Sequence, residues 1–147
     1  MTDTLDRFLK AQEHIYPTAL REIRAGRKES HWMWFIFPQM RGLGMSAMAY
    51  IYGITDRPEA EAYLAHPVLS ARLHEITEAL LALDESNPNV IFGGIDAMKL
   101  RSSMTLFAAV SEDGSVFHRT LAKFFGGKTD QRTLELLGDT KNDQNRT

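Results

Sequence analysis

The chain has 147 residues, of which 44% are hydrophobic and 24% charged, with a net charge of −2 and no cysteine. This length predicts one domain with its own core. Because the net charge is small and negative, the chain has no overall positive charge that would attract nucleic acid. The lack of cysteine excludes disulfides and thiol catalysis. The first residues lack a signal-peptide layout, and no apolar run reaches the roughly 20 residues that span a bilayer. We therefore expect a cytoplasmic protein that binds neither membrane nor nucleic acid.

Apolar residues recur at three- and four-residue steps over residues 5–23, which predicts a helix. Pro17 interrupts this stripe, and because proline lacks an N–H and clashes with the preceding turn, two helices or one kinked helix are expected. Gln12 is the polar residue on the stripe. A buried amide needs partners, so Gln12 either braces a neighbouring backbone or faces a cavity.

Residues 30–44 form the aromatic stretch of the chain, with the sequence SHWMWFIFPQMRGLG. It holds both tryptophans, Trp32 and Trp34. A run this apolar is either buried or an exposed patch that marks a binding site. His31 at its start is a candidate acid–base group, or it bonds a backbone carbonyl at a helix start. Gln39, after a proline and before a flexible turn, is placed to contact a polar ligand.

The later segments repeat the helical pattern between turn residues. The steps of four and three residues from Leu69 to Leu83 predict the clearest helix. Val90-Ile91-Phe92 indicates a buried turn or a brief strand, and no long period-two alternation predicts a sheet. Helices are expected over residues 46–53, 57–65, 69–83, 97–111, 115–125 and 131–137. The prediction is an all-α fold, a single compact domain of roughly six to eight helices over residues 1–137, followed by a disordered polar tail over 138–147.

Several polar residues lie around the helix that is expected after Gly93-Gly94. Asp96 is a candidate both for the helix N-cap and for an acid–base group, and Lys99 is a candidate anion contact. Lys99 and Arg101 point about 160° apart on a helix, so at most one of them faces a given pocket. Ser103 is a candidate ligand contact, or its hydroxyl bonds to the preceding turn. The five histidines lack metal-ligand spacing, so neither a metal nor another cofactor is expected.

Two segments are distinctive: HWMWFIFPQ over residues 31–39 and SSMTLF over residues 102–107. With further matches between about residues 7 and 127, they resemble a bacterial family of unknown function, small helical proteins sometimes labelled calpastatin-like. The resemblance implies a mainly helical fold and brings no established activity or catalytic residue. The further matches are Phe8, Ala11-Gln12, Tyr16, Ala19-Leu20, Glu22, Gly26, Gly42-Leu-Gly44, Tyr63-Leu64, His66-Pro67, Ile91-Phe-Gly93, Asp96 and Lys99-Leu100.

A looser similarity concerns an enzyme class. A Gln-x-x-x-Tyr segment at residues 12–16, a leucine-rich helix, the turn from Phe92 to Asp96, a lysine and an apolar helix follow in this order. This order is similar to N-glycosidase-like proteins that act on ribosylated or ADP-ribose-type compounds. That class has tryptophan-glycine where this chain has Phe92-Gly93, and its acidic residues have no one-to-one counterparts here. The similarity implies cleavage of a glycosidic bond at a polar ribose site.

Two functions and one structural interpretation remain open from the sequence. The first function is an enzyme that acts on a nucleotide-like or ribosylated small molecule. The second is a non-catalytic module whose aromatic patch binds a protein partner or a second copy of the chain. In the structural interpretation the aromatic stretch is core. The sequence sets neither the ligand nor the oligomeric state. For the enzyme, the candidate catalytic residues are Asp96 and His31, and the candidate ligand contacts are Gln12, Trp32, Trp34, Gln39, Lys99 and Ser103.

Overall fold

Ten helices and one isolated parallel bridge, between Met40 and Ile54, make up the regular structure of residues 4–138, the part of the chain that the computed structural model describes. The all-α prediction is confirmed for these residues, whereas six to eight helices is too low a number. The tail predicted over residues 138–147 falls, apart from Gly138, outside the described residues. The helices are α1 (Asp6–Gln12), α2 (Tyr16–Arg24), α3 (Met33–Ile36), α4 (Ala47–Ile51), α5 (Arg57–Ala65), α6 (Pro67–Leu81), α7 (Pro88–Phe92), α8 (Gly94–Ala109), α9 (Val116–Phe125) and α10 (Gln131–Leu137).

Two short helices, α3 and α7, account for the difference in number. α3 lies inside the aromatic stretch and has four residues, and α7 replaces the turn or brief strand expected at residues 90–92. Helices this short complete little more than one turn, so a 3.6-residue repeat has no length in which to appear. Asn87, in a segment whose composition predicts a loop, caps α7, because its side chain accepts a hydrogen bond from the Asn89 N–H at 2.9 Å.

Prolines and polar caps set most helix boundaries. Pro17 lies in the first turn of α2, and the chain breaks between α1 and α2 as the interrupted stripe predicts. Ser46 caps α4 by accepting from the Ala49 N–H at 3.1 Å. His66 separates α5 from α6 and caps α6 through its Nδ1. Local sequence chemistry therefore fixes where these helices begin.

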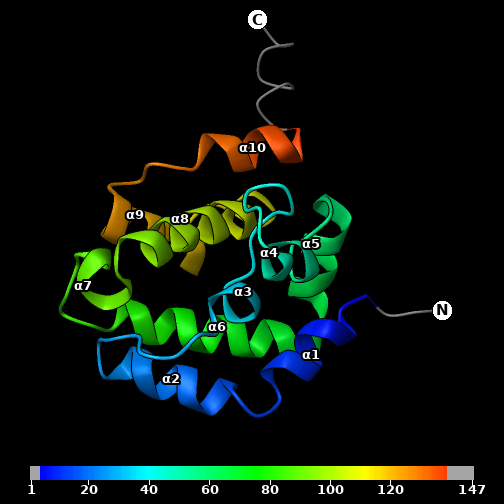
Figure 1. The fold of residues 1–147 in the computed structure, drawn as a ribbon. Helices are drawn as coiled ribbons and strands as arrows, with labels where there is room; N and C mark the ends of the chain where they lie inside the picture. Colours follow the sequence, from blue (N-terminus) through cyan, green and yellow to red (C-terminus); the bar gives the residue numbers. More distant parts are fainter. Residues whose placement is uncertain (1–3, 139–147) are drawn as a thin grey trace, which may run out of the picture.

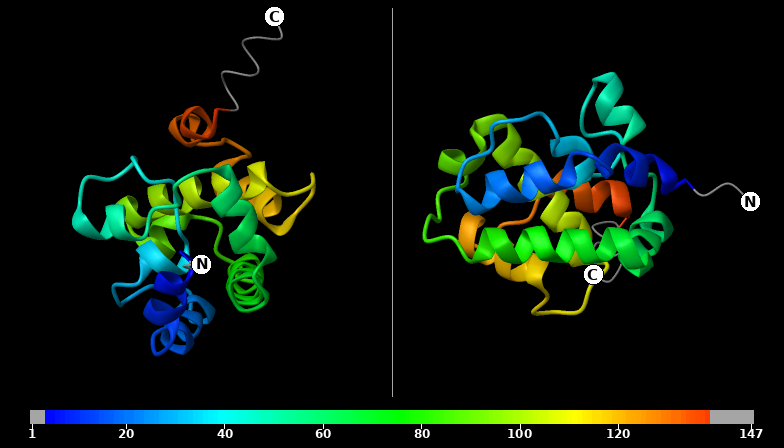
Figure 2. Two further views of the ribbon diagram at one scale, coloured as in Figure 1. Left: turned by 90° about the vertical axis from the view of Figure 1, so that its right-hand side faces the viewer. Right: turned by 90° about the horizontal axis from the view of Figure 1, so that it is seen from below.

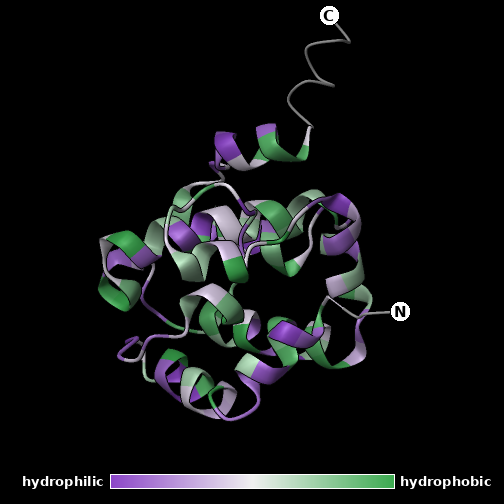
Figure 3. Ribbon diagram, turned by 45° about the vertical axis from the view of Figure 1, so that its right-hand side comes forward, coloured by the Kyte–Doolittle hydropathy of each residue, from purple (hydrophilic) through white to green (hydrophobic). Residues whose placement is uncertain are grey.

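Helix α8 lies at the centre of the fold and contacts α5, α7, α9 and α10. Nine of its sixteen residues are buried, which explains why apolar residues surround most of this helix. Helices α1 and α2 lie on one side of α8 and α10 lies on the opposite side (Figures 1 and 2). Helix α6 contacts α2, α5 and α9. Hydrophilic and hydrophobic residues alternate along many of the helices (Figure 3), as expected for helices packed around one core.

The aromatic stretch is largely core. Trp32 is fully buried, Met33, Ile36 and Phe37 are at most 2% exposed, and Phe35 is also buried. Trp34 is the exception, with a half-buried side chain. This segment is thus part of the core and presents one partly exposed ring, that of Trp34, toward the surface. Within residues 4–138, no helix combines the length and the apolar character needed to cross a bilayer.

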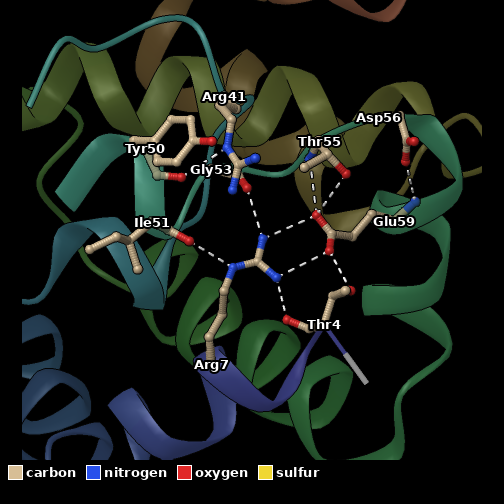
Figure 4. Close-up of polar contacts among 9 residues, drawn as sticks. All are labelled: Thr4, Arg7, Arg41, Tyr50, Ile51, Gly53, Thr55, Asp56 and Glu59. Atoms are coloured by element: carbon tan, nitrogen blue, oxygen red, sulfur yellow. Dashed lines mark hydrogen bonds and ion pairs between the residues drawn. The ribbon is translucent and has the colours of Figure 1, made fainter. Parts of the chain in front are cut away.

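A polar cluster around Arg7 joins α1 to the connection between α4 and α5 (Figure 4). Arg7 Nε donates to the Ile51 carbonyl at 2.7 Å and Nη2 donates to the Gly53 carbonyl at 2.8 Å. Both terminal nitrogens of Arg7 also lie 3.1 Å from the two carboxylate oxygens of Glu59. Glu59 in turn accepts from the Thr55 N–H at 2.9 Å. The cluster holds the start of α1 against residues 51–59, two segments that are distant in the sequence.

Candidate functional site

An open cavity of about 420 Å³ lies where the aromatic stretch meets the beginning of α8. Four of the eight candidate site residues line it, namely His31, Trp34, Asp96 and Lys99. They come from the loop before α3, from α3 itself and from the first turns of α8. The full lining is Lys28, His31, Met33, Trp34, Phe92, Gly93, Gly94, Ile95, Asp96 and Lys99.

The Glu22 carboxylate anchors the loop that carries Lys28 and His31. It accepts the N–H groups of Glu29 and Ser30 at 2.8 and 3.0 Å and the Trp32 Nε1–H at 2.9 Å. Burial raises the pKa of Glu22, but the Ser30 hydroxyl and these N–H donors outweigh burial and lower the pKa to about 2. Glu22 is therefore ionised at neutral pH and holds one wall of the cavity in place.

A backbone bond brings this loop to the start of α8. The Lys28 N–H donates to the Ile91 carbonyl of α7 at 2.8 Å. The Lys28 ammonium then lies 2.9 Å from Asp96 Oδ2, and its side chain is only 7% exposed. It also donates to the Ser30 carbonyl at 2.5 Å. Lys28 is not among the residues predicted from the sequence, because no periodicity or motif in a loop indicates which distant helix that loop will contact.

Asp96 lies between two lysines. Its Oδ2 pairs with Lys28 at 2.9 Å and its Oδ1 lies 3.4 Å from the Lys99 ammonium. The two lysines and one aspartate leave one net positive charge at the cavity wall. The N-terminal end of α8, which adds partial positive charge, is at the same place. The cavity is thus electrostatically suited to an anion.

The expected N-cap role of Asp96 is wrong. Helix α8 begins at Gly94, so that Asp96 is its third residue, and no side chain caps this end. Gly93 has φ of +80°, a backbone conformation that favours glycine, and it ends α7 directly before α8 begins. The two glycines were assigned to a loop, although the second one is helical. As a result the Asp96 carboxylate pairs with the two cavity lysines and makes no cap hydrogen bond at the start of α8.

The two tryptophans have different surroundings. Trp32 is fully buried, and the Lys28 ammonium lies 5.0 Å from its ring centroid. Trp34 lines the cavity, and the Lys99 ammonium lies 4.8 Å from its ring centroid. Each lysine therefore makes a cation–π contact with one tryptophan and an ion pair with Asp96. Trp34 is the tryptophan that offers an aromatic surface to a ligand in this cavity, and Phe92, which also lines it, is only 7% exposed.

Two of the other candidates, Gln12 and Trp32, belong to the interior. The Gln12 amide donates to the Phe35 carbonyl at 2.7 Å and to the Tyr63 hydroxyl at 3.0 Å. Its oxygen accepts from Arg72 at 3.2 Å. Of the two alternatives for Gln12, the structure places it as a brace for neighbouring groups and not in the lining of this cavity.

Gln39 and Ser103 are also buried and do not line the cavity. Gln39 takes part in the bridge beside α4, where its carbonyl accepts from the Ile54 N–H at 2.9 Å. Ser103 is fully buried on α8, and its hydroxyl has no hydrogen-bond partner among the described residues. Other hydroxyls of α8 do bond to the preceding turn, as Thr105 does to the Arg101 carbonyl at 2.8 Å.

A family model for proteins of unknown function, DUF1810, matches residues 2–137. The chain belongs to the DUF1810 family. The resemblance to a family of unknown function is thereby confirmed at the level of the family. A crystal structure of the conserved hypothetical protein Rv1873 from Mycobacterium tuberculosis is similar, with a TM-score of 0.89 and 48% sequence identity. The match covers 91% of this chain and 96% of that one. A comparison with curated proteins found no match.

The cavity of this DUF1810 protein combines three kinds of group. Trp34 provides a planar apolar surface, Lys28 and Lys99 provide cations, and Asp96 with His31 provides titratable groups. His31 is exposed at the rim, free of the core packing that fixes its neighbour Trp32. Stacking, anion binding and proton transfer are the interactions that these residue types supply.

Proposed function

We propose that this chain is a small-molecule enzyme that acts on a nucleotide-like or ribosylated compound in the cavity beside α8. The observation that carries the proposal is the convergence of Trp34, Asp96 and Lys99 on one open cavity. A base stacks on Trp34, because a flat apolar ring suits a flat heterocycle. A phosphate binds Lys99, because an ammonium group makes strong charge-assisted hydrogen bonds to phosphate.

The proposed reaction is hydrolysis of a glycosidic bond at the ribose. Asp96 accepts a proton from a water molecule as the water oxygen bonds to the anomeric carbon. The bond between that carbon and the base breaks, and its electron pair stays on the base. His31 donates a proton to the departing base and recovers it from Asp96 through solvent, so that one water is consumed and the free base and the ribosyl product form. Asp96 and His31 both line the cavity, which supports this division of roles.

The alternative function, a partner-binding module, draws less support from the aromatic stretch. Trp32, Phe35 and Phe37 are buried in the core, and Trp34 is half-buried in the cavity wall. A protein-binding patch needs apolar side chains that a partner can cover. We therefore do not favour this surface as a docking site.

A thermal-shift screen with AMP, ADP-ribose, NAD and ribose 5-phosphate tests the proposed ligand class, because a ligand that binds the folded state raises its stability. Chromatography of the same mixtures detects a released base. We expect a rise in Tm with at least one of these compounds and release of a base from AMP, ADP-ribose or NAD, because ribose 5-phosphate carries no base and reports binding alone. A screen in which none raises Tm and none is cleaved contradicts the proposal.

The Asp96→Asn variant tests the assigned role. We expect it to bind the ligand but to release base about 10² to 10⁴ times more slowly, the usual range for a lost acid–base group. Asp84→Asn is the matched control, because Asp84 is exposed and lies outside the cavity lining. Equal rates of base release for Asp96→Asn and Asp84→Asn would show that Asp96 is not the acid–base group of the reaction.

A further inference from the structure

The two lysines of the cavity are held very differently. The Lys28 side chain is 7% exposed, and its ammonium has the Ser30 carbonyl at 2.5 Å and Asp96 at 2.9 Å as partners. The Lys99 side chain is 25% exposed and its ammonium lies 3.4 Å from Asp96. Lys28 is therefore fixed in place. Lys99 is the cation with the longer ion pair and the greater freedom to move.

Lys99 also lies over the Trp34 ring, on which a flat ligand would stack. Its ammonium lies 4.8 Å from the centroid of the Trp34 ring, and both side chains line the cavity. A flat ring that stacks on this face of Trp34 displaces the ammonium from it. The displaced ammonium also gives up its position beside Asp96 Oδ1, and a phosphate on the ligand would replace that lost anionic partner. A ring alone offers no such anion, whereas a ring that carries a phosphate does.

We infer that Lys99 is a specificity-determining residue that makes the site selective for phosphorylated ligands, of which a nucleoside monophosphate is the simplest class. The ligand phosphate draws Lys99 away from Trp34 and Asp96. This movement opens the ring face and frees Asp96 Oδ1. The inference rests on the proposed function and deepens it, because the same phosphate that identifies the ligand also releases the carboxylate assigned to proton transfer.

Calorimetric titration of the full chain with AMP and with adenosine tests the selectivity, because the two compounds differ only by the phosphate. We expect the wild type to bind AMP about tenfold to hundredfold more tightly than adenosine, the range for hydrogen bonds to a charged group. In Lys99→Met, which keeps an unbranched apolar side chain beside Trp34, the two affinities should become equal within about threefold. Lys128→Met is the control, because Lys128 is exposed and outside the cavity lining.

Asp96→Asn provides a second and opposite readout. If Asp96 competes with the phosphate for Lys99, removing its charge should tighten AMP binding several-fold. If Asp96 instead contacts the ligand directly in the bound state, the same substitution weakens AMP binding, which overturns the inference. Thermal unfolding of each variant confirms that a change in affinity does not arise from a change in fold.

The possible outcomes separate the two proposals. Binding of AMP and adenosine with equal affinity by the wild type, or a selectivity that Lys99→Met leaves unchanged, overturns the role of Lys99 and leaves the nucleotide-like ligand class intact. Binding of neither compound, together with no response to the other compounds of the screen, overturns both the proposed function and this inference.

Discussion

Arg7 and Glu59 form a two-pronged ion pair, in which each terminal nitrogen of the guanidinium lies 3.1 Å from one oxygen of the carboxylate. The Glu59 side chain is 8% exposed and that of Arg7 is 21% exposed. The pair is therefore shielded from water, and the remaining Arg7 donors are used by backbone carbonyls around α4 (Figure 4). The pair therefore holds α1 against α5.

Arg7→Ala should lower the free energy of unfolding by about 3 kcal/mol, because it leaves the Glu59 carboxylate without its cationic partner and the carbonyls of Thr4, Ile51 and Gly53 without this donor. Urea denaturation at neutral pH measures the change. Arg119→Ala is the matched control, since the Arg119–Glu78 pair is more than half exposed at both partners and should contribute less than about 1 kcal/mol. Similar losses in the two variants would show that the Arg7 cluster is no more than a surface contact.

Acid should weaken the fold through Glu59 and Glu22. Burial raises the pKa of Glu59, but the hydrogen bonds from Arg7, Thr4 and the Thr55 N–H and the Arg7 charge together lower it to about 2. The pKa of Glu22 is also lowered to about 2. Because the folded-state pKa lies below the ordinary value of 4.5, each carboxylate stabilises the fold above that value and loses its contribution as the pH falls toward 2.

The measurement is urea denaturation of the wild type and of Glu59→Gln at several pH values between 7 and about 2. We expect the free energy of unfolding of the wild type to fall below about pH 5, and that of Glu59→Gln to start lower and fall less steeply. Parallel curves for the two proteins would mean that Glu59 does not titrate with the lowered pKa.

Glu22→Gln should loosen the wall of the cavity. The amide keeps the size of the carboxylate but loses the charge that holds the Ser30 hydroxyl and the Trp32 indole N–H. We expect a loss of about 2 kcal/mol in the free energy of unfolding and a shift of tryptophan emission to longer wavelength. Glu29→Gln is the control, because the Glu29 side chain is exposed. An emission spectrum unchanged by Glu22→Gln would contradict the anchoring role.

Two glycine substitutions should act in opposite directions. A Cβ at Gly53 would lie 2.6 Å from the Arg41 backbone, beside the parallel bridge, so Gly53→Ala should cost about 3 kcal/mol. A Cβ at Gly94 meets nothing within 4 Å, and this residue is helical, so Gly94→Ala should stabilise by about 0.5 kcal/mol. Thermal unfolding checks both. A lower Tm for Gly94→Ala would show that this glycine has a conformational role.

Sequence periodicity predicted the helices that are long enough to show it. The seam from Leu69 to Leu83 predicted most of α6, and Pro17 marked the break between α1 and α2. Helices α3 and α7 were missed because four or five residues carry no repeat, whereas α4, which is as short, was predicted between Ser46 and Gly53. The start of α8 was placed three residues late, because Gly94 was taken for loop although only Gly93 has a positive φ.

The candidate site was predictable only in part. Lys99, Asp96 and Trp34 were selected by residue type, and the chain brings them together. Trp32 was selected for the same reason, yet it is buried and donates to Glu22 while its neighbour two positions away lines the cavity. Lys28 was not selected, because its position depends on the hydrogen bond from its N–H to the Ile91 carbonyl in a distant segment. Such long-range contacts cannot be recognised from the local sequence.

A crystal structure of the protein soaked with AMP tests the central claim most directly. We predict density for the base against the Trp34 ring and for the phosphate within hydrogen-bonding distance of Lys99, with the Lys99 ammonium moved from its present position 3.4 Å from Asp96. An empty cavity at a saturating concentration of AMP, or AMP bound elsewhere on the surface, would contradict the assignment of this cavity as the functional site.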